Sequence, residues 1–77
     1  MNEKIIEILE GIHDGVDYAS ATDLIDSGLL DSFDVVSLIG ELQEEFDIQI
    51  TINDMVPENF NSVDAIAALI KRIEDDI

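Results

Sequence analysis

The sequence contains no cysteine and only one histidine, His13, among its 77 residues. Without cysteine the chain can form neither a disulfide framework nor a thiolate metal site, and a single histidine excludes a metal site built from histidines. Any thiol that the function requires therefore has to be supplied by an attached group.

Long apolar runs are also missing. No stretch approaches the ~18 apolar residues that a membrane-spanning helix needs, and the amino-terminal residues lack the basic-then-apolar pattern of a secretory signal. These absences predict a soluble, cytoplasmic protein without membrane insertion. With 47% apolar residues the chain can build a core, and its length predicts a single domain over residues 1–77, which we expect to be a monomer.

Basic residues are scarce. There are 3 Lys and Arg against 19 Asp and Glu, a formal net charge of −16, and no lysine or arginine lies between Lys4 and Lys71. Such a chain repels nucleic acid and anionic membranes, whereas basic patches on protein partners attract it. The alternative is that the acidity only keeps a small protein soluble.

Three segments show the apolar spacing of helices. Residues 3–13 have one apolar face, with Asn2 as a plausible N-cap, and residues 63–73 have another, with Ser62 as N-cap. The strongest pattern runs from Ser32 to Phe46, where Asp31 or Ser32 can cap the helix. The expected core residues of these faces are Ile5, Ile8, Leu9, Ile12, Val35, Leu38, Ile39, Leu42, Phe46, Val63, Ile66, Ala67, Ile70 and Ile73.

The remaining segments are expected to be less regular. Residues 14–31 contain Gly, Ser and Asp between apolar residues and predict a long loop pinned to the core. Residues 48–52 alternate but have no partner strand, so they predict an extended connector that buries its isoleucines. We expect one helical turn at 53–56, a loop at 59–61 and a frayed end at 74–77. Tyr18 and Phe60 are expected as anchors, and Met55 is expected to pack. The predicted fold is all-α, a small bundle of three main helices plus one short helix with a long first loop.

Ser32 stands where the long loop gives way to the second helix. The free N–H groups and the positive dipole end of a helix amino terminus favour an anion, so a phosphodiester on this hydroxyl is well placed. The alternative is that Ser32 only caps the helix.

The helix face opposite the predicted core stripe is unusual for a solvated surface. It carries Phe33 and Val36 among polar residues, and an apolar centre with acidic flanks is typical of a docking surface. The residues of this face are Phe33, Val36, Ser37, Gly40, Gln43 and Glu44.

The stretch Leu30-Asp31-Ser32-Phe33-Asp34-Val35-Val36, followed by Leu38, resembles the phosphopantetheine attachment motif of acyl carrier proteins. Length, acidity and helix positions extend the resemblance over nearly the whole chain. It implies an acyl-carrier-like fold, with 4'-phosphopantetheine attached to Ser32 by a phosphopantetheinyl transferase and Asp31 as a motif neighbour. It also implies a loading ligase and a downstream transferase or synthase with basic docking surfaces. The expected partner-binding residues are Phe33, Asp34, Val36, Ser37, Gly40, Glu41, Glu44 and Glu45, with Asp31 as a further acidic contact.

Two departures from the motif bear on the type of carrier. Phe33 stands where leucine is usual, and Ser37 stands where fatty-acid carriers commonly have glutamate. Together with the segment 56–62 (VPENFNS), these residues are similar to D-alanyl carrier proteins and to discrete carriers of specialised pathways. The resemblance therefore favours these over bulk fatty-acid synthesis, and the cargo stays open.

Three alternatives to a carrier are a calcium-binding module, an enzyme and an acidic docking domain. A calcium site would use the aspartates of the first loop, but no window has the ligand spacing of an EF-hand. An enzyme would have to rely on His13, beside which no nucleophile and orienting group occur together. An acidic docking domain without a prosthetic group shares every feature except use of the Ser32 hydroxyl. The favoured interpretation is a carrier that is not itself an enzyme.

Overall fold

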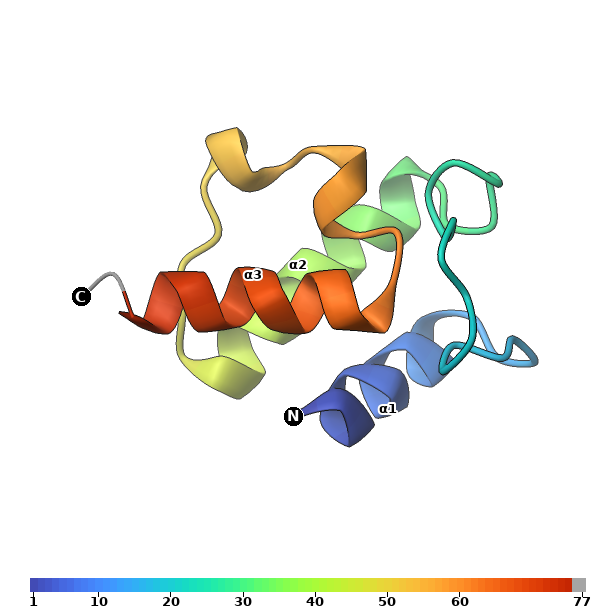
Figure 1. Ribbon diagram of the computed structural model, residues 1–77, viewed down its shortest axis with the longest axis horizontal. Coiled ribbons are helices and arrows are strands. Elements are labelled where there is room, and N and C mark those ends of the chain that lie inside the picture. The colour runs from blue at the N-terminus through green and yellow to red at the C-terminus, as the bar shows by residue number, and fades with distance from the viewer. Residues whose placement is uncertain (76–77) are drawn as a thin grey trace.

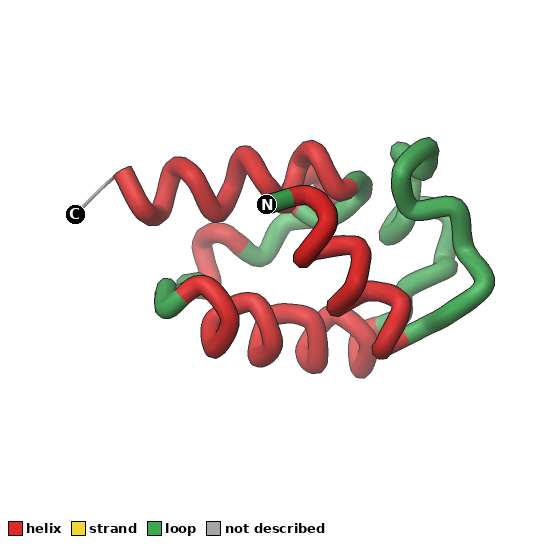
Figure 2. The backbone as a smooth tube through the Cα atoms, turned by 90° about the horizontal axis from the view of Figure 1, so that it is seen from below, coloured by secondary structure: helices red, strands yellow, loops and turns green. Residues whose placement is uncertain are grey.

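The computed structural model describes residues 1–75 and shows a helical bundle. Its elements are α1 (Asn2–Ile12), α2 (Ser32–Phe46), the 3-10 turns η1 (Ile52–Asp54) and η2 (Pro57–Asn59), and α3 (Val63–Asp75). α1 packs on both α2 and α3, and η2 packs on α3. In Figure 1, α3 crosses in front of α2, and in Figure 2 the long first loop lies at one end of the bundle. The predicted all-α fold with three main helices is confirmed. Within the described residues, no helix combines the length and apolarity needed to cross a membrane.

The core forms where the apolar faces of the helices meet. Leu42 of α2 and Ile66 of α3 are fully buried, as their helical spacing predicts. Val35 and Phe46 are half-buried at the edge of the core, and Leu69 is buried although it was not predicted. The buried hydrophobic residues are Ile5, Leu9, Tyr18, Leu24, Leu30, Leu38, Ile39, Leu42, Ile50, Phe60, Val63, Ile66, Leu69 and Ile70.

The ends of α1 and α3 differ in part from the prediction. Asn2 is the first residue of α1 and not its cap, because its side-chain amide donates to Asp64 Oδ1 of α3 at 3.0 Å. Ser62 does cap α3, since its hydroxyl accepts from the Ala65 N–H at 3.0 Å. The helix runs to Asp75, so the start of the predicted frayed end, at Glu74, is helical, and residues 76–77 lie outside the described part of the chain.

The long loop of residues 14–31 is held from inside, as predicted. Tyr18 is 2% exposed, and its hydroxyl lies within hydrogen-bonding distance of the main-chain oxygens of Leu9 and His13. Burial raises the pKa of Tyr18, and the nearby charges of Asp34 and other carboxylates raise this pKa further. The hydroxyl therefore stays protonated at neutral pH and keeps its hydrogen bond.

The connector between α2 and α3 differs from the prediction in two places. Ile50 is buried and its N–H donates to Gln43 Oε1 at 2.9 Å, but Ile52 is 83% exposed. Ile52 opens η1 because Thr51 and Asp54 form a capping box that starts this turn ahead of the predicted residue 53. Pro57 then starts a second turn that was not predicted, since its fixed φ suits the first position of a helical turn, and this turn includes Asn59, the first residue of the loop expected at 59–61.

Candidate functional site

Ser32 is the first residue of α2, and its side chain is exposed. The helix is capped by Asp31, whose Oδ1 accepts from the Asp34 N–H at 2.9 Å, while Asp34 Oδ2 accepts from the Asp31 N–H at 3.3 Å. This reciprocal pair is a capping box. The Ser32 hydroxyl therefore stands at the helix amino terminus without serving as its cap.

The surface beside Ser32 is apolar. Phe33 is 85% exposed and Val36 is 63% exposed, so neither the η turns nor the first loop covers them. Single exposed apolar residues are common in proteins, but two large ones on one helical turn next to a free hydroxyl form a patch. Ser37 and Gly40 on the same helix are also exposed.

An open groove of ≈ 430 Å³ runs beside the Ser32 side chain. Asp31 and Ser32 are the polar residues at its edge, and the other lining side chains are apolar. They come from three segments that lie far apart in the sequence. The lining residues are Ile25, Leu30, Asp31, Ser32, Val35, Val36, Met55, Val56, Pro57 and Phe60. Met55, which was expected to pack, is 44% exposed and faces this groove.

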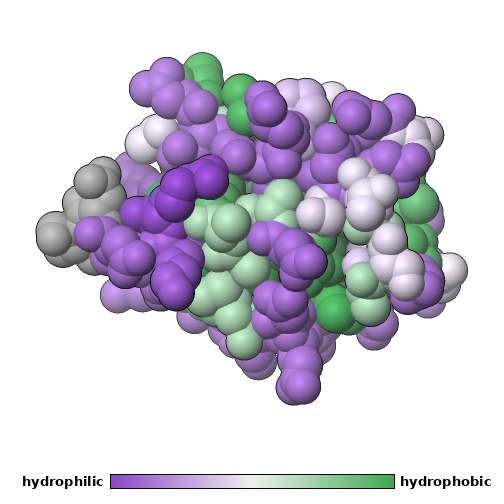
Figure 3. Space-filling model, viewed as in Figure 1, coloured by the Kyte–Doolittle hydropathy of each residue, from purple (hydrophilic) through white to green (hydrophobic). Residues whose placement is uncertain are grey.

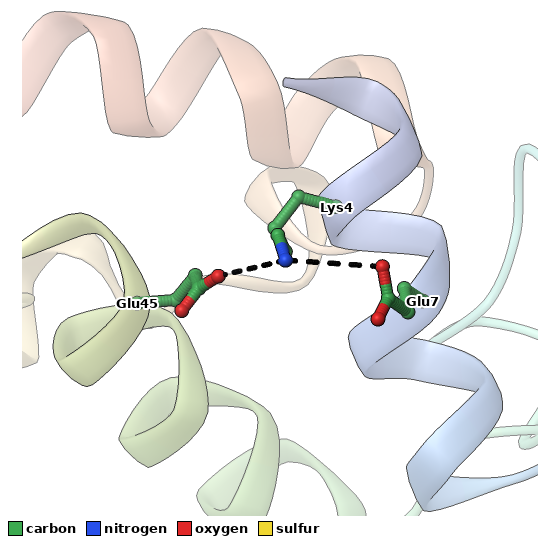
Figure 4. A network of polar contacts seen from close by, with 3 residues as sticks. All are labelled: Lys4, Glu7 and Glu45. Carbon is green, nitrogen blue, oxygen red and sulfur yellow. Dashed lines mark ion pairs between the residues drawn. The ribbon is translucent and has the colours of Figure 1, made fainter.

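One carboxylate of α2, that of Glu45, is paired with a lysine of α1. Lys4 Nζ of α1 lies 3.0 Å from Glu45 Oε1 and 3.8 Å from Glu7 Oε2, so it joins α1 to α2 (Figure 4). The hydrogen bond to Glu45, with the charges of Glu45 and Glu7, raises the pKa of Lys4. Glu41 and Glu44 are exposed. The view in Figure 3 is dominated by hydrophilic residues, with hydrophobic residues in smaller groups.

Comparison with known proteins places the chain in a family. The family model described as "Phosphopantetheine attachment site" matches residues 3–70. The chain belongs to the phosphopantetheine-binding carrier family. Among similar proteins, the D-alanyl carrier protein of Streptococcus uberis is 33% identical over 76 residues, 97% of this chain and 96% of the relative. That of Lactococcus lactis subsp. lactis is 32% identical over 78 residues, 99% of each. That of Bacillus cereus is 35% identical over 75 residues, 95% of this chain and 91% of the relative.

The site of this carrier suits a covalently held phosphodiester. The hydroxyl of Ser32 is exposed, and the amino terminus of α2 favours an anion through its N–H groups and its dipole. The groove beside it offers apolar surface to a group that is attached to the hydroxyl oxygen. Phosphopantetheine is the prosthetic group of the family, and Ser32 and Asp31 are the residues of the predicted motif at this position.

The structure brings most of the predicted site residues of the carrier onto one surface. Phe33, Val36, Ser37, Gly40, Glu41 and Glu44 are exposed on α2, whereas Asp34 is half-buried and Glu45 is paired with Lys4. The groove residues of the first loop and of the connector were not predicted as site residues, and neither was Asn61, which accepts hydrogen bonds from the first loop. Their apolar character was visible in the sequence, but no periodic spacing linked them to Ser32.

Replacing Asp31 by alanine is expected to lower the free energy of unfolding by about 1 kcal/mol, because the N–H of Asp34 then loses its side-chain acceptor. Asp31→Asn keeps an acceptor oxygen and should lose much less. Urea unfolding followed by circular dichroism measures both variants. Equal stability of Asp31→Ala and the wild type would show that this capping box does not stabilise α2.

Proposed function

We propose that this chain is a discrete, non-catalytic carrier that receives 4'-phosphopantetheine on Ser32 and carries D-alanine. The terminal thiol of the bound group holds the cargo as a thioester. The attached group thereby supplies the thiol that a chain without cysteine lacks. A phosphopantetheinyl transferase attaches the group from coenzyme A, a ligase loads the amino acid, and a downstream transferase accepts it. We place these steps in the cytoplasm and assign them to residues 1–77 as one monomeric domain.

The observation that carries this proposal is the free Ser32 hydroxyl at the start of α2. Because Asp31 makes the cap, the helix does not need the serine hydroxyl for its own stability. An exposed serine at a helix terminus, beside an open groove and inside a family match of residues 3–70, is best explained as an attachment point. The D-alanine cargo rests on the relatives named D-alanyl carrier protein.

The docking surface for the partner enzymes is proposed to lie on the exposed face of α2. Phe33 and Val36 supply an apolar centre next to Ser32, and Glu41 and Glu44 extend the surface along the helix. Apolar centres provide most of the binding energy of an interface, while complementary charge speeds the encounter. Glu45 contributes less to the attraction of a basic partner, because Lys4 Nζ lies 3.0 Å from Glu45 Oε1 and partly neutralises its charge.

The function is tested by two reactions in sequence. The purified chain is incubated with coenzyme A and a broad-specificity phosphopantetheinyl transferase, and its intact mass is recorded. The modified chain is then offered to a D-alanine–carrier ligase with ATP and D-alanine, and in parallel to a fatty acyl–carrier ligase with a fatty acid. We expect loading with D-alanine. Modification followed by loading with the fatty acid alone would reject the proposed cargo, and a folded chain that no transferase modifies would be an acidic docking domain without prosthetic group.

Replacing Gly40 by alanine is expected to stabilise the fold and weaken docking at the same time. Gly40 is exposed in the middle of α2, and a Cβ atom there meets no atom within 4 Å. Alanine should therefore raise the free energy of unfolding by about 1 kcal/mol, the helix-propensity difference. On a close-packed docking face the added methyl should raise the KM of the loading ligase at least about fivefold.

Gly11 offers a matched control for this variant. It is an exposed glycine of α1 with the same open space around its Cβ position, and it lines a groove with Glu41 and Glu44, so it borders the acidic part of the proposed docking surface and not its apolar centre. Gly11→Ala should stabilise the fold in the same way but raise the KM of the ligase less than Gly40→Ala, because it adds no methyl group beside Phe33 and Val36. A Gly40→Ala variant with wild-type KM would show that Gly40 is not part of the docking surface.

A further inference from the structure

Asn61 connects the segment before α3 to the first loop by four hydrogen bonds. Its Oδ1 accepts from the N–H of Ile25 at 2.9 Å and from the N–H of Asp26 at 3.1 Å, and its Nδ2 donates to Asp26 Oδ2 at 3.1 Å. Its main-chain oxygen accepts from the Leu24 N–H at 2.9 Å. One side chain thus ties together segments that lie more than thirty residues apart in the sequence.

The loop segment that Asn61 holds is a compact unit. The N–H of Leu30 donates to the Leu24 oxygen at 3.0 Å, and the N–H of Ser27 donates to the Asp23 oxygen at 2.7 Å. A further turn closes at Gly28, whose φ of +80° suits glycine. Because residues 23–30 are bonded to one another, a shift at Asn61 is expected to move the whole unit.

This unit forms one wall of the groove beside Ser32. Ile25 and Leu30 line the groove from the loop, and Phe60, the neighbour of Asn61, lines it from the connector. Leu30 directly precedes the cap of α2, so the position of the loop also determines how the chain enters the helix. Asn61 therefore sits between the groove walls formed by Ile25 and Phe60.

We propose that Asn61 is a positioning residue that sets the spacing of the groove walls, and with it the presentation of Ser32 to the enzymes that act there. The inference rests on the proposed function of Ser32. An amide is suited to this place because it accepts from two N–H groups and donates to a carboxylate with the same side chain. Aspartate has nearly the same shape but lacks the donor, and it would place a second carboxylate against Asp26.

The test compares Asn61→Asp with the double variant Asn61→Asp/Asp26→Asn, in which the new amide at position 26 can donate to the new carboxylate. Steady-state phosphopantetheinyl transfer gives kcat and KM for each full-length variant, below its unfolding temperature. We expect Asn61→Asp to lower kcat/KM about tenfold, mainly through KM, and the double variant to recover most of it. Asn53→Asp adds the same charge at an exposed position and should behave as the wild type.

The outcomes separate this inference from the proposed function. A wild-type chain that is never modified would overturn the function itself, whereas a normally modified wild type with an unchanged Asn61→Asp would overturn only the role of Asn61. A lowered melting temperature with unchanged KM would assign Asn61 a purely structural role and also reject the inference. If Asn61→Asp does not fold, Asp26→Ala removes only the exposed carboxylate and should raise KM about threefold, and an unchanged KM there would be equally decisive.

Discussion

Replacing Ser32 by alanine is expected to abolish attachment of phosphopantetheine without destabilising the fold. The substitution removes the hydroxyl to which we assign the group, so the intact mass should not change on incubation with coenzyme A and transferase. Asp31 remains the cap, and alanine has the higher helix propensity, so the free energy of unfolding should stay equal or rise by up to about 0.5 kcal/mol. Mass spectrometry and urea unfolding on the same sample measure both quantities.

Ser20→Ala is the control for this prediction. Ser20 is an exposed serine of the first loop, outside the proposed docking surface, and its loss should leave the mass gain intact. A Ser32→Ala chain that still gains the group would assign the attachment to a different hydroxyl. A fall in stability of about 1 kcal/mol would instead indicate that Ser32 shares in capping the helix.

The start of α2 shows which features of the site could be predicted from the sequence and which could not. The predicted helix from Ser32 to Phe46 has the bounds of α2, because apolar side chains recur at helical spacing up to Phe46 and a capping residue marks the start. Both Asp31 and Ser32 are good N-cap residues, so the sequence left the choice open. The distance of 2.9 Å from Asp31 Oδ1 to the Asp34 N–H decides it, and with it the freedom of the Ser32 hydroxyl.

The groove and its supports could not be predicted, since they depend on contacts between distant segments. Ile25 and Phe60 lie in irregular parts of the chain, where no period indicates which way a side chain points. Asn61 looked like an ordinary loop residue, because the hydrogen bonds it makes reach residues far earlier in the sequence. Ile52 was expected to be buried from its alternation with polar neighbours, but the capping box of Thr51 and Asp54 ends the extended segment before it.

The second large effect is expected at Phe60, where alanine should lower the free energy of unfolding by about 3–5 kcal/mol. Phe60 is 2% exposed and packs in the core while also lining the groove. A chain of this length has a total stability of about 4–12 kcal/mol, so the variant should be partly unfolded at 37 °C. Circular dichroism during heating and urea titration measures the loss.

The three phenylalanines of the chain allow the same truncation to be compared at three degrees of burial. Phe33 is 85% exposed, Phe46 is half-buried and Phe60 is 2% exposed, so the loss of stability on replacement by alanine should increase in that order. Phe33→Ala should stay within about 0.5 kcal/mol of the wild type, yet raise the KM of the loading ligase through the lost apolar contact. A Phe60→Ala chain as stable as Phe33→Ala would contradict the burial of Phe60. Because Phe33 is exposed, it contributes little to the core. A stable Phe33→Ala chain with unchanged KM would therefore show that Phe33 is not part of the proposed docking surface.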